Sequence, residues 1–342
     1  MDTINKLSFR VQYGKLLRLY PALFSYEERK ELRAIIKRYY ALFPLEGEAP
    51  GRSISDKMQI VQIVLEEIGL GKAAVLSVLF HELVENKQLS VAEIENKFNT
   101  QLSSIIQGMM RVGELYERNA SLETENFRKL FLTFAEDVRV ILIIIAEHLQ
   151  IMRTLEMFPE ESRQNIARET SFLYAPLAHR MGLYAVKTEL EDLSLKHTNR
   201  EIYREIAHKL NETKRSRDQF ISEFIAPLKE KLSDIGFNFE IKGRTKSIHS
   251  IYTKIKKQNT AFENIYDLFA IRIIFDVPLE KERRHAGKLI RLWRICISLI
   301  RNAFVTGYPS QKQTDMKVFT RLCWALKAVG WKSRYELNGW MR

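Results

Sequence analysis

The chain has 342 residues, of which 46% are apolar and 28% are charged, so it can form sizeable cores in more than one domain. Its longest apolar run, residues 140–146, is far too short to cross a bilayer, and its two cysteines lie far apart and imply no disulfide framework. These features exclude a membrane-spanning or disulfide-stapled protein and, with an N-terminus that lacks an apolar secretory segment, they predict a cytoplasmic location.

Residues 1 to about 225 carry the apolar spacing of helices. Apolar residues recur at intervals of three and four, while the alternation typical of strands is scarce. The segments with this spacing are 27–43, 55–68, 90–98, 125–155 and 160–183. Ser90-Val-Ala-Glu93 has the pattern of a capping box, which predicts the start of the third segment. This part of the chain is therefore predicted to be all-α.

Histidines and acids stand at the ends of two apolar helices in this part. His81 and Glu82 follow one apolar run, and Glu147 and His148 end another. Side chains of these types from two helices can converge on one divalent ion. A histidine beside a glutamate at a helix end is more often a solvated terminus, so the pattern alone favours that second interpretation.

The hydrophobic period changes after the helical part. Residues 198–232 form a polar, charged helical stretch broken near Pro227, which we interpret as a bridge between two domains. Residues 237–241 then alternate like a strand, a helix is predicted from Ser247, and 265–275 is a second, apolar strand. Strand, helix and strand in this order begin an α/β or α+β domain.

Basic residues gather between the two predicted strands. They occupy a predicted turn at 243–247 and the helix after it: Arg244, Lys246, Lys254, Lys256 and Lys257. The second strand has Asp267 and Arg272 as its only charges. Cations followed by one acid suggest a triphosphate with a divalent metal. Taken alone, the lysines could equally form a solvated helix face and Asp267 could be a turn acid.

Several segments together carry a specific resemblance. In chain order they are SVLFHELVEN, FAEDVRVILIIIAEHLQIMRTLEMF, FLYAPLAHRMGL, TELEDLSL and GRTKSIHSIYTK, within about 53–276. They resemble the RelA/SpoT family of bacterial enzymes, which make and degrade the alarmone (p)ppGpp. The resemblance implies a mostly α HD-type hydrolase domain that uses manganese, followed by a truncated α+β, nucleotidyltransferase-like synthetase domain. The synthetase transfers pyrophosphate from ATP to the 3′-hydroxyl of GDP or GTP.

The resemblance places the hydrolase site on residues that are partly substituted here. Asp56 replaces a metal-binding histidine, Glu82 replaces the aspartate that pairs with His81, and Glu147 replaces a later metal-binding aspartate. Each longer acid displaces its carboxylate by a methylene, and Asn86, in place of a catalytic aspartate, cannot transfer protons. We therefore expect a degenerate metal site, loss of manganese-dependent hydrolysis, and a role as a regulatory scaffold.

In the second domain the resemblance gives the basic cluster a role. It implies that the ATP phosphates are bound by Arg244, Lys246, Ser247, Ser250 and Lys254. Asp267 is the implied magnesium ligand, and Arg272 is implied to counter the same polyanion, so both are catalytic candidates. Transfer of this kind is mostly positioning and charge neutralisation, which arginine forks and lysine point charges provide.

Residues 283–342 differ from the rest of the chain in composition. Their 13 lysines and arginines against two acids account for +11 of the net +12, and they hold all four tryptophans and both cysteines. The family's guanine-stacking Asn-Gly-Tyr segment and second magnesium carboxylate are missing after Asp276. The segment can be back-translated with freely chosen synonymous codons and then read two nucleotides later. This second frame can give PERLRDW, KANGYESLHTTV and MEVQIRTERMDE, which are the missing family motifs in the family's order. We interpret the segment as an out-of-frame tail, with the frame changing near residues 281–284.

The predicted organisation follows from these points. The segments are 1–195 for the hydrolase-like domain, 196–232 for a helical linker, 233–282 for half of the synthetase and 283–342 for the tail. The resemblance implies descent from a GTP pyrophosphokinase that binds ATP and GTP or GDP with magnesium, and we expect the chain to be inactive as it stands. The alternatives are a non-catalytic regulator that binds nucleotide, pairs with a full-length homologue or forms a homo-oligomer, and RNA binding by the basic tail. No membrane or ribosome association is expected.

Overall fold

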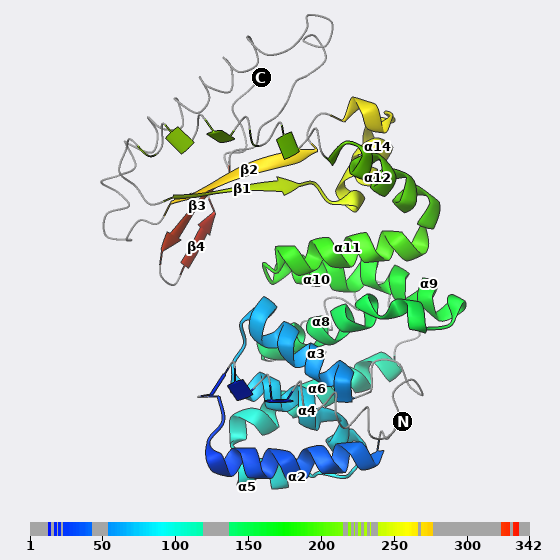
Figure 1. The fold of residues 1–342 in the computed structure, drawn as a ribbon. Helices are drawn as coiled ribbons and strands as arrows, with labels where there is room; N and C mark the ends of the chain where they lie inside the picture. The colour runs from blue at the N-terminus through cyan, green and yellow to red at the C-terminus, as the bar shows by residue number, and fades with distance from the viewer. Residues whose placement is uncertain are drawn as a thin grey trace, which may run out of the picture. The chain divides into compact units, whose positions relative to one another are not determined.

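The computed structural model describes residues 23–42, 54–118, 137–214, 239–265, 268–275, 323–328 and 331–334, with some positions between 13 and 21 and between 218 and 233. It divides into two compact units, residues 1–200 and 201–342 (Figure 1). Among the described residues, no helix has both the length and the apolar character needed to span a membrane.

The first unit is helical throughout its described part, which confirms the predicted all-α character. Its elements are α2 (Tyr26–Leu42), α3 (Ile54–Gln62), η1 (Ile63–Ile68), α4 (Lys72–Glu85), α5 (Val91–Lys97), α6 (Thr100–Arg118), α8 (Val138–Arg153), η2 (Leu155–Met157), α9 (Glu160–Glu169), η3 (Thr170–Tyr174), α10 (Ala175–Arg180) and α11 (Tyr184–Thr198). Of the predicted segment 125–155, residues 125–136 lie outside the described part.

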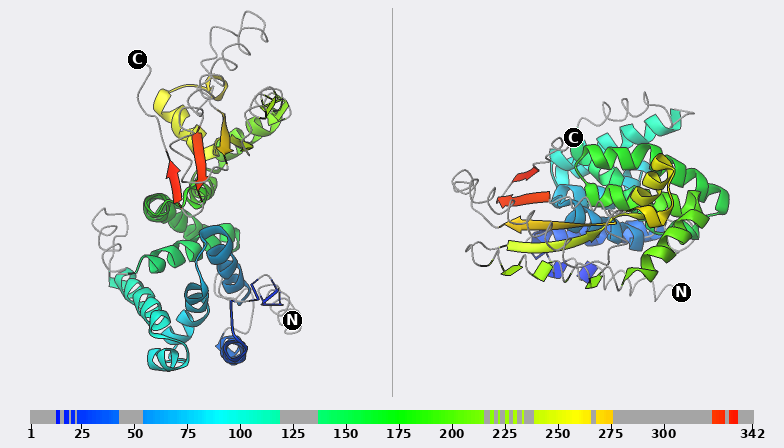
Figure 2. Two further views of the ribbon diagram at one scale, coloured as in Figure 1. Left: turned by 90° about the vertical axis from the view of Figure 1, so that its left-hand side faces the viewer. Right: turned by 90° about the horizontal axis from the view of Figure 1, so that it is seen from above.

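Helices α4 and α8 supply much of the core of this unit. Every residue of α4 from Ala74 to Phe80 is buried, and α8 contacts α3, α4, α6, α10 and α11. Figure 2 shows the ribbon of these helices from two further sides. Burying each large apolar side chain stabilises the fold by about 1.5–3 kcal/mol. A Cβ atom at Gly108 of α6 would lie 2.7 Å from Val140 Cγ2, so only glycine allows α6 to approach α8 this closely.

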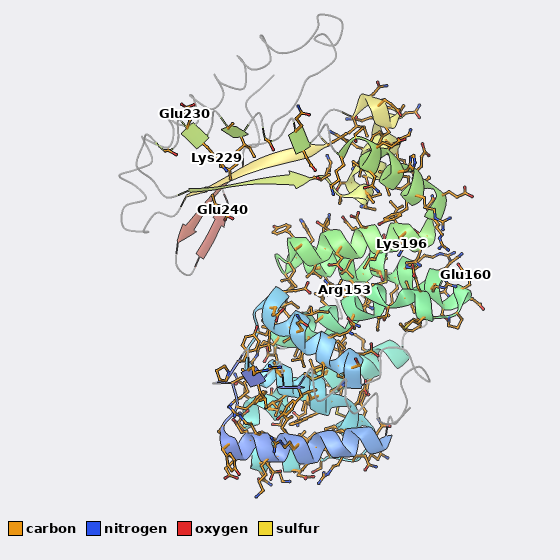
Figure 3. All side chains as sticks on the ribbon, viewed as in Figure 1. Arg153, Glu160, Lys196, Lys229, Glu230 and Glu240 are labelled. Carbon is orange, nitrogen blue, oxygen red and sulfur yellow. The ribbon has the colours of Figure 1, made fainter. Side chains whose placement is uncertain are left out.

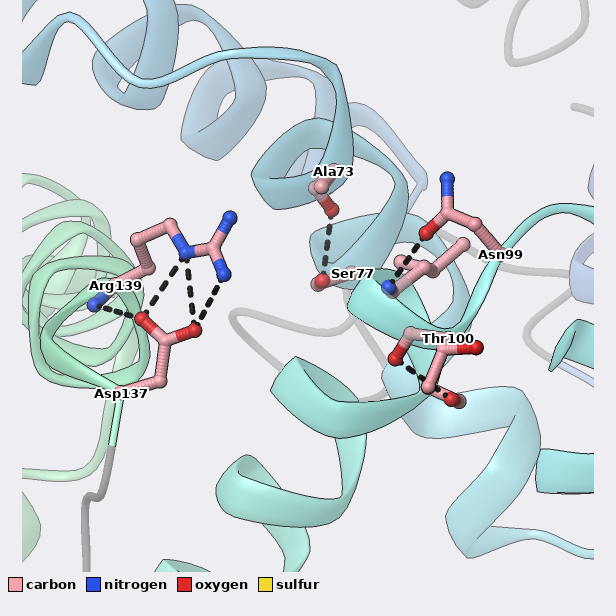
Figure 4. Close-up of polar contacts among 8 residues, drawn as sticks. Ala73, Ser77, Asn99, Thr100, Asp137 and Arg139 are labelled. Carbon is pink, nitrogen blue, oxygen red and sulfur yellow. Dashed lines mark hydrogen bonds and ion pairs between the residues drawn. The ribbon is translucent and has the colours of Figure 1, made fainter.

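Side chains fix where the helices of this region begin. The Asp137 carboxylate accepts a hydrogen bond from Arg139 N and pairs with the Arg139 guanidinium, which caps α8 (Figure 4). Asn99 Oδ1 accepts from Leu102 N at 2.8 Å and caps α6 in the same way. Ser90 Oγ accepts from Glu93 N at 3.1 Å, which confirms the predicted start of α5.

The predicted helix 160–183 is divided into three pieces. A π-helical turn, η3, separates α9 from α10, and α10 ends at Arg180 before Gly182, whose φ is +74°. Pro176 has no N–H to donate to the preceding turn, so an unbroken α-helix cannot run through it. A wider π turn absorbs the mismatch.

The second unit contains α12 (Arg200–Glu212), β1 (Phe239–Thr245), α14 (Ile248–Gln258), η4 (Phe262–Asn264), β2 (Phe269–Phe275), β3 (Cys323–Ala328) and β4 (Trp331–Arg334). The four strands form one mixed sheet in the order β1-β2-β3-β4. β1 is antiparallel to β2, β3 is parallel to β2, and β4 is antiparallel to β3. The predicted α+β character is therefore confirmed.

The strand limits differ from those predicted. Gly243, Arg244 and Thr245 continue β1 instead of opening a turn, because each pairs with a residue of β2. Ile265 ends the short helix η4, and β2 begins only at Phe269. Ile265 is 4% exposed and belongs to a buried core of the second unit, not to the strand pairing of β2.

Helix α12 is part of the second unit rather than only a bridge to it. Its Ile206 and Leu210 share a small core with Ile251, Phe262 and Ile265. Lys209 Nζ lies 2.8 Å from Glu263 Oε1 on the rim of this core. The remainder of the predicted linker is described only at isolated positions.

Residues 323–334 contribute two strands that the sequence analysis does not anticipate. Cys323 pairs with Arg272 at the start of the parallel ladder between β2 and β3. Strand β2 is apolar and β-branched, and a further strand protects its backbone groups from remaining at an edge. The other residues of segment 283–342 lie outside the described part.

Candidate functional site

Three helices of the first unit bring two carboxylates to one lysine. Lys57 lies on α3, Glu82 on α4 and Glu147 on α8. Lys57 Nζ is 2.8 Å from Glu82 Oε1 and 3.3 Å from Glu147 Oε1. The exposed fractions of the three side chains are 4%, 11% and 20% in that order. We call these residues the buried ion triad.

The two carboxylates keep the lysine charged. Burial alone would lower the pKa of Lys57, because it removes the ammonium group from water. The negative charges of Glu147 and Glu82 outweigh burial and raise the pKa to about 12. At neutral pH the triad therefore holds one positive charge between two carboxylates.

Other ion pairs of the same unit lie closer to solvent. Arg153 Nε is 2.6 Å from Glu189 Oε1, and the Arg153 guanidinium also contacts Glu67. Figure 3 labels Arg153. Lys196 Nζ is 2.7 Å from Glu156 Oε1. About a third or more of each of these side chains is exposed, so water and salt screen their attraction. The buried ion triad therefore differs from these ion pairs in being shielded from water and salt.

Asp56 is engaged by an amide beside the triad. Gln150 Nε2, from α8, donates to Asp56 Oδ1 at 3.4 Å and also contacts Gln59 Oε1. Gln150 is 2% exposed. The carboxylate of Asp56 is therefore held by a hydrogen-bond donor.

His81 lies near an acid on its own helix. His81 Nε2 is 3.1 Å from Glu85 Oε1, one turn along α4. The geometry is not that of a hydrogen bond, and neither ring nitrogen has a hydrogen-bond partner among the described residues. Asn86 Nδ2 donates to the Glu82 carbonyl oxygen at 2.8 Å, so this side chain binds the end of its own helix.

These residues do not fit a metal ion. In the part of the chain that the structure describes, no three His, Cys, Asp or Glu side chains lie close enough together to hold one. Of the four predicted positions, Asp56, His81, Glu82 and Glu147, the structure joins Glu82 to Glu147, but around an ammonium group. A divalent ion about 2.0–2.2 Å from both carboxylates would need the space that Lys57 Nζ occupies.

His148 is turned into the core rather than toward the triad. Its ring stacks on Tyr174 with centroids 3.5 Å apart, and Nε2 lies 2.7 Å from Thr170 Oγ1. The Thr170 hydroxyl donates its proton to Ile166 O at 2.6 Å, so His148 Nε2 carries the proton in this pair. Burial lowers the pKa of His148 to about 3, which keeps the ring neutral.

Lys57 is the functional residue that the sequence analysis misses. A signal for it exists, since Ile60, Val61 and Val64 are all buried and lie three, four and seven residues further along. Lys57 therefore occupies the apolar face of its helical segment. A lysine at such a position requires an internal partner, because an unpaired buried charge is strongly unfavourable.

In the second unit, several predicted phosphate-binding residues meet where α14 begins. Ser247 caps this helix by accepting from Ser250 N at 3.2 Å, and Ser247 Oγ also donates to Ser250 Oγ at 2.8 Å. Lys246 N donates to Leu268 O at 2.8 Å, which ties the start of the helix to the residue before β2. Lys246 and Lys254 are half-buried. A helix N-terminus with basic side chains favours an anion.

The strand register positions the remaining basic residues. Arg244 is opposite Ala270, and Arg272 is opposite Lys242. Asp267 lies outside the described residues, so the predicted magnesium ligand stays a prediction.

Comparison with known proteins agrees with this arrangement. A family described as "HD domain" matches residues 37–184, and one described as "Region found in RelA / SpoT proteins" matches 243–313. A guanosine-3′,5′-bis(diphosphate) 3′-pyrophosphohydrolase of Aquifex aeolicus is 30% identical over 82% of this chain. A GTP pyrophosphokinase of Myxococcus xanthus is 36% identical over 62%, and the bifunctional (p)ppGpp synthase/hydrolase SpoT of Escherichia coli is 31% identical over 63%.

The extent of these matches matters for function. The aligned regions span 39%, 28% and 31% of the lengths of the three relatives. The match to the second region ends at residue 313, beyond residues 281–284 where we expect the frame to change. Similarity therefore continues into the segment interpreted as a tail, and the frame change stays a prediction.

Proposed function

We infer the function of this chain from the family to which it belongs, the RelA/SpoT family. We propose that it takes part in (p)ppGpp metabolism, the chemistry named in its relatives. The observation that carries this proposal is the presence of both family regions, in the family's order, on one chain. The cytoplasmic location expected from composition is part of the same proposal.

We propose that the helical unit does not hydrolyse (p)ppGpp. Lys57 occupies the space between Glu82 and Glu147, and Asn86 cannot serve as a general acid or base. Without a metal-activated water, attack on the 3′-pyrophosphate has no nucleophile. The test is incubation of the whole chain with ppGpp and Mn²⁺, for which we expect no release of pyrophosphate. Manganese-dependent release would refute the proposal.

We propose that the second unit binds ATP with magnesium. Its binding groups are Arg244, Lys246, Ser247, Ser250 and Lys254, with Asp267 as magnesium ligand and Arg272 beside the phosphates. The hydroxyls and backbone amides that begin α14 support this assignment, since they suit a phosphate group. We expect ATP binding to depend on magnesium and to weaken about tenfold or more in Lys246→Ala. Equal affinity in that variant would count against the assignment.

We propose that pyrophosphate transfer to GDP or GTP stays incomplete. The missing groups are the guanine-stacking segment and the second magnesium carboxylate. Thin-layer chromatography of the whole chain with labelled ATP and GDP should show no ppGpp, and a ppGpp spot would disprove this point. Sequencing the gene around codon 282 tests the cause, because a restored frame would supply both groups.

Two non-catalytic functions compete with a purely vestigial enzyme. One is a regulator that pairs with a full-length homologue or a second copy, which a change in the homologue's activity on mixing would reveal. The +11 balance of residues 283–342 favours RNA binding. That function predicts strongly salt-dependent binding that is lost when residues 283–342 are deleted.

A further inference from the structure

The buried ion triad stands where the family resemblance places a metal. We propose that the Lys57 ammonium group takes the place of a divalent ion between Glu82 and Glu147 and makes the helical unit independent of metal. The inference rests on the proposed assignment of these two glutamates as former metal positions. It goes further than loss of hydrolysis, because it names the group that replaced the ion.

The first support is the geometry of the contact. One Nζ atom lies within hydrogen-bonding reach of a carboxylate from α4 and within 3.3 Å of a carboxylate from α8, while its own backbone belongs to α3. An ammonium group has three donors and no acceptor, so it can bridge acids from different helices as a cation does. Lys57 is 3% exposed overall, which leaves the bridge inside the protein.

The second support is charge exclusion. A divalent ion bound to Glu82 and Glu147 would lie within a few ångströms of the ammonium group, in surroundings where repulsion between like charges is weakly screened. Either cation balances the two carboxylates, but the two cannot do so together. A chain that carries Lys57 at this position has therefore exchanged a dissociable ion for a covalently attached one.

The third support is the state of the neighbouring group. Asp56, which could have completed a metal site, accepts from the Gln150 amide instead. Gln150 is 2% exposed and also contacts Gln59, so the amide is fixed between two partners. Donors of the protein therefore contact all three carboxylates: Lys57 contacts Glu82 and Glu147, and Gln150 contacts Asp56.

The direct test is a titration of the whole chain with Mn²⁺ alone, followed by electron paramagnetic resonance of the free ion. We expect no stoichiometric site that depends on Glu147, so the wild type and Glu147→Gln should leave the same amount of Mn²⁺ free. One equivalent bound by the wild type and released in Glu147→Gln would overturn the proposal. No nucleotide is present, so this result is separate from the hydrolysis and synthesis assays.

Variants of the lysine test the exchange from the other side. Lys57→Met keeps the length of the side chain and removes the charge, and we expect it to unfold at a lower temperature and to recover part of the loss when Mn²⁺ is added. Lys57→Arg retains the cation and should show no response to Mn²⁺. If Lys57→Met folds and shows no more response to Mn²⁺ than Lys57→Arg, the proposal is wrong. If it does not fold, the comparison of wild type with Glu147→Gln decides the question.

Discussion

The two units place their functional charges in opposite environments. In the first unit, Lys57 and its two carboxylates are buried among apolar helices. In the second, Lys246 and Ser247 are half-buried at the start of α14 and Lys254 is half-buried further along it, beside a described core of five buried residues. A charge with an internal partner becomes part of the fold, whereas basic and hydroxyl groups at a helix N-terminus suit an anion from solution.

The largest expected effect comes from removing the buried cation. Lys57→Met leaves Glu82 and Glu147 close together without a counter-charge, which should lower the free energy of unfolding by about 3–5 kcal/mol. Urea denaturation measures this change. The matched control is Lys196→Met, which removes a lysine at a similar distance from an acid, but 34% exposed. It should cost less than about 1 kcal/mol. Equal losses would mean that burial does not distinguish the two pairs.

The next effect tests whether the two units unfold separately. Ile251 is fully buried in the small core of the second unit, and Ile251→Ala should cost about 2–5 kcal/mol there. Hydrogen exchange should then show loss of protection in α12 and α14 while α4 and α8 stay protected. Ile143→Ala, at an equally buried position of α8, should give the reverse pattern. Loss of protection in both units from either change would contradict this separation.

A smaller effect should appear with pH. Burial lowers the pKa of His148 from 6.5 to about 3. Below pH 6.5 the unfolded chain binds a proton at this residue that the folded chain does not, so the protein loses stability as pH falls from 6.5 towards 3. The expected slope is about 1.4 kcal/mol per pH unit. Burial raises the pKa of Glu169 to about 7, although a hydrogen bond from Tyr174 acts to lower it. Between pH 4.5 and 7 the protein therefore loses stability through Glu169 as pH rises.

His148 and Glu169 make stability change with pH in opposite directions, so variants of the two residues can be compared with the wild type. Relative to the wild type, His148→Phe, which retains an aromatic ring beside Tyr174, should gain stability as pH falls from 6.5 to 4.5. Glu169→Gln should gain as pH rises over 4.5–7. Unfolding measured across this range tests both, and parallel pH profiles for the wild type and His148→Phe would show that His148 does not titrate as expected.

The smallest effect concerns a single cap. Ser247→Ala removes the hydroxyl that accepts from Ser250 N, which should cost about 1 kcal/mol and weaken ATP binding. Ser90→Ala removes an equivalent cap in the first unit and should cost about the same. Only the first change should alter the ATP affinity, as measured by calorimetric titration. A drop in affinity with Ser90→Ala would indicate an indirect effect of stability.

Much of this arrangement follows from local pattern. The three- and four-residue spacing predicts the helices, because amphipathic faces reflect the helical period directly. Ser90 and Ser247 mark two helix starts because a hydroxyl before an amide is a local interaction. The break near Pro176 and the extension of β1 to Thr245 do not follow from local pattern, since one depends on how a helix accommodates proline and the other on a partner strand.

The family, the helical character of the first unit and the cluster of cations ahead of β2 can all be predicted from the order of residues along the chain. Each is a matter of residue types at close spacing along the chain. The surroundings of the degenerate metal positions cannot be predicted in this way, because Lys57, Glu82 and Glu147 are far apart in sequence and meet through the packing of three helices. A substitution list shows that ligands changed, but the position of one ammonium group between two buried carboxylates shows what balances their charge.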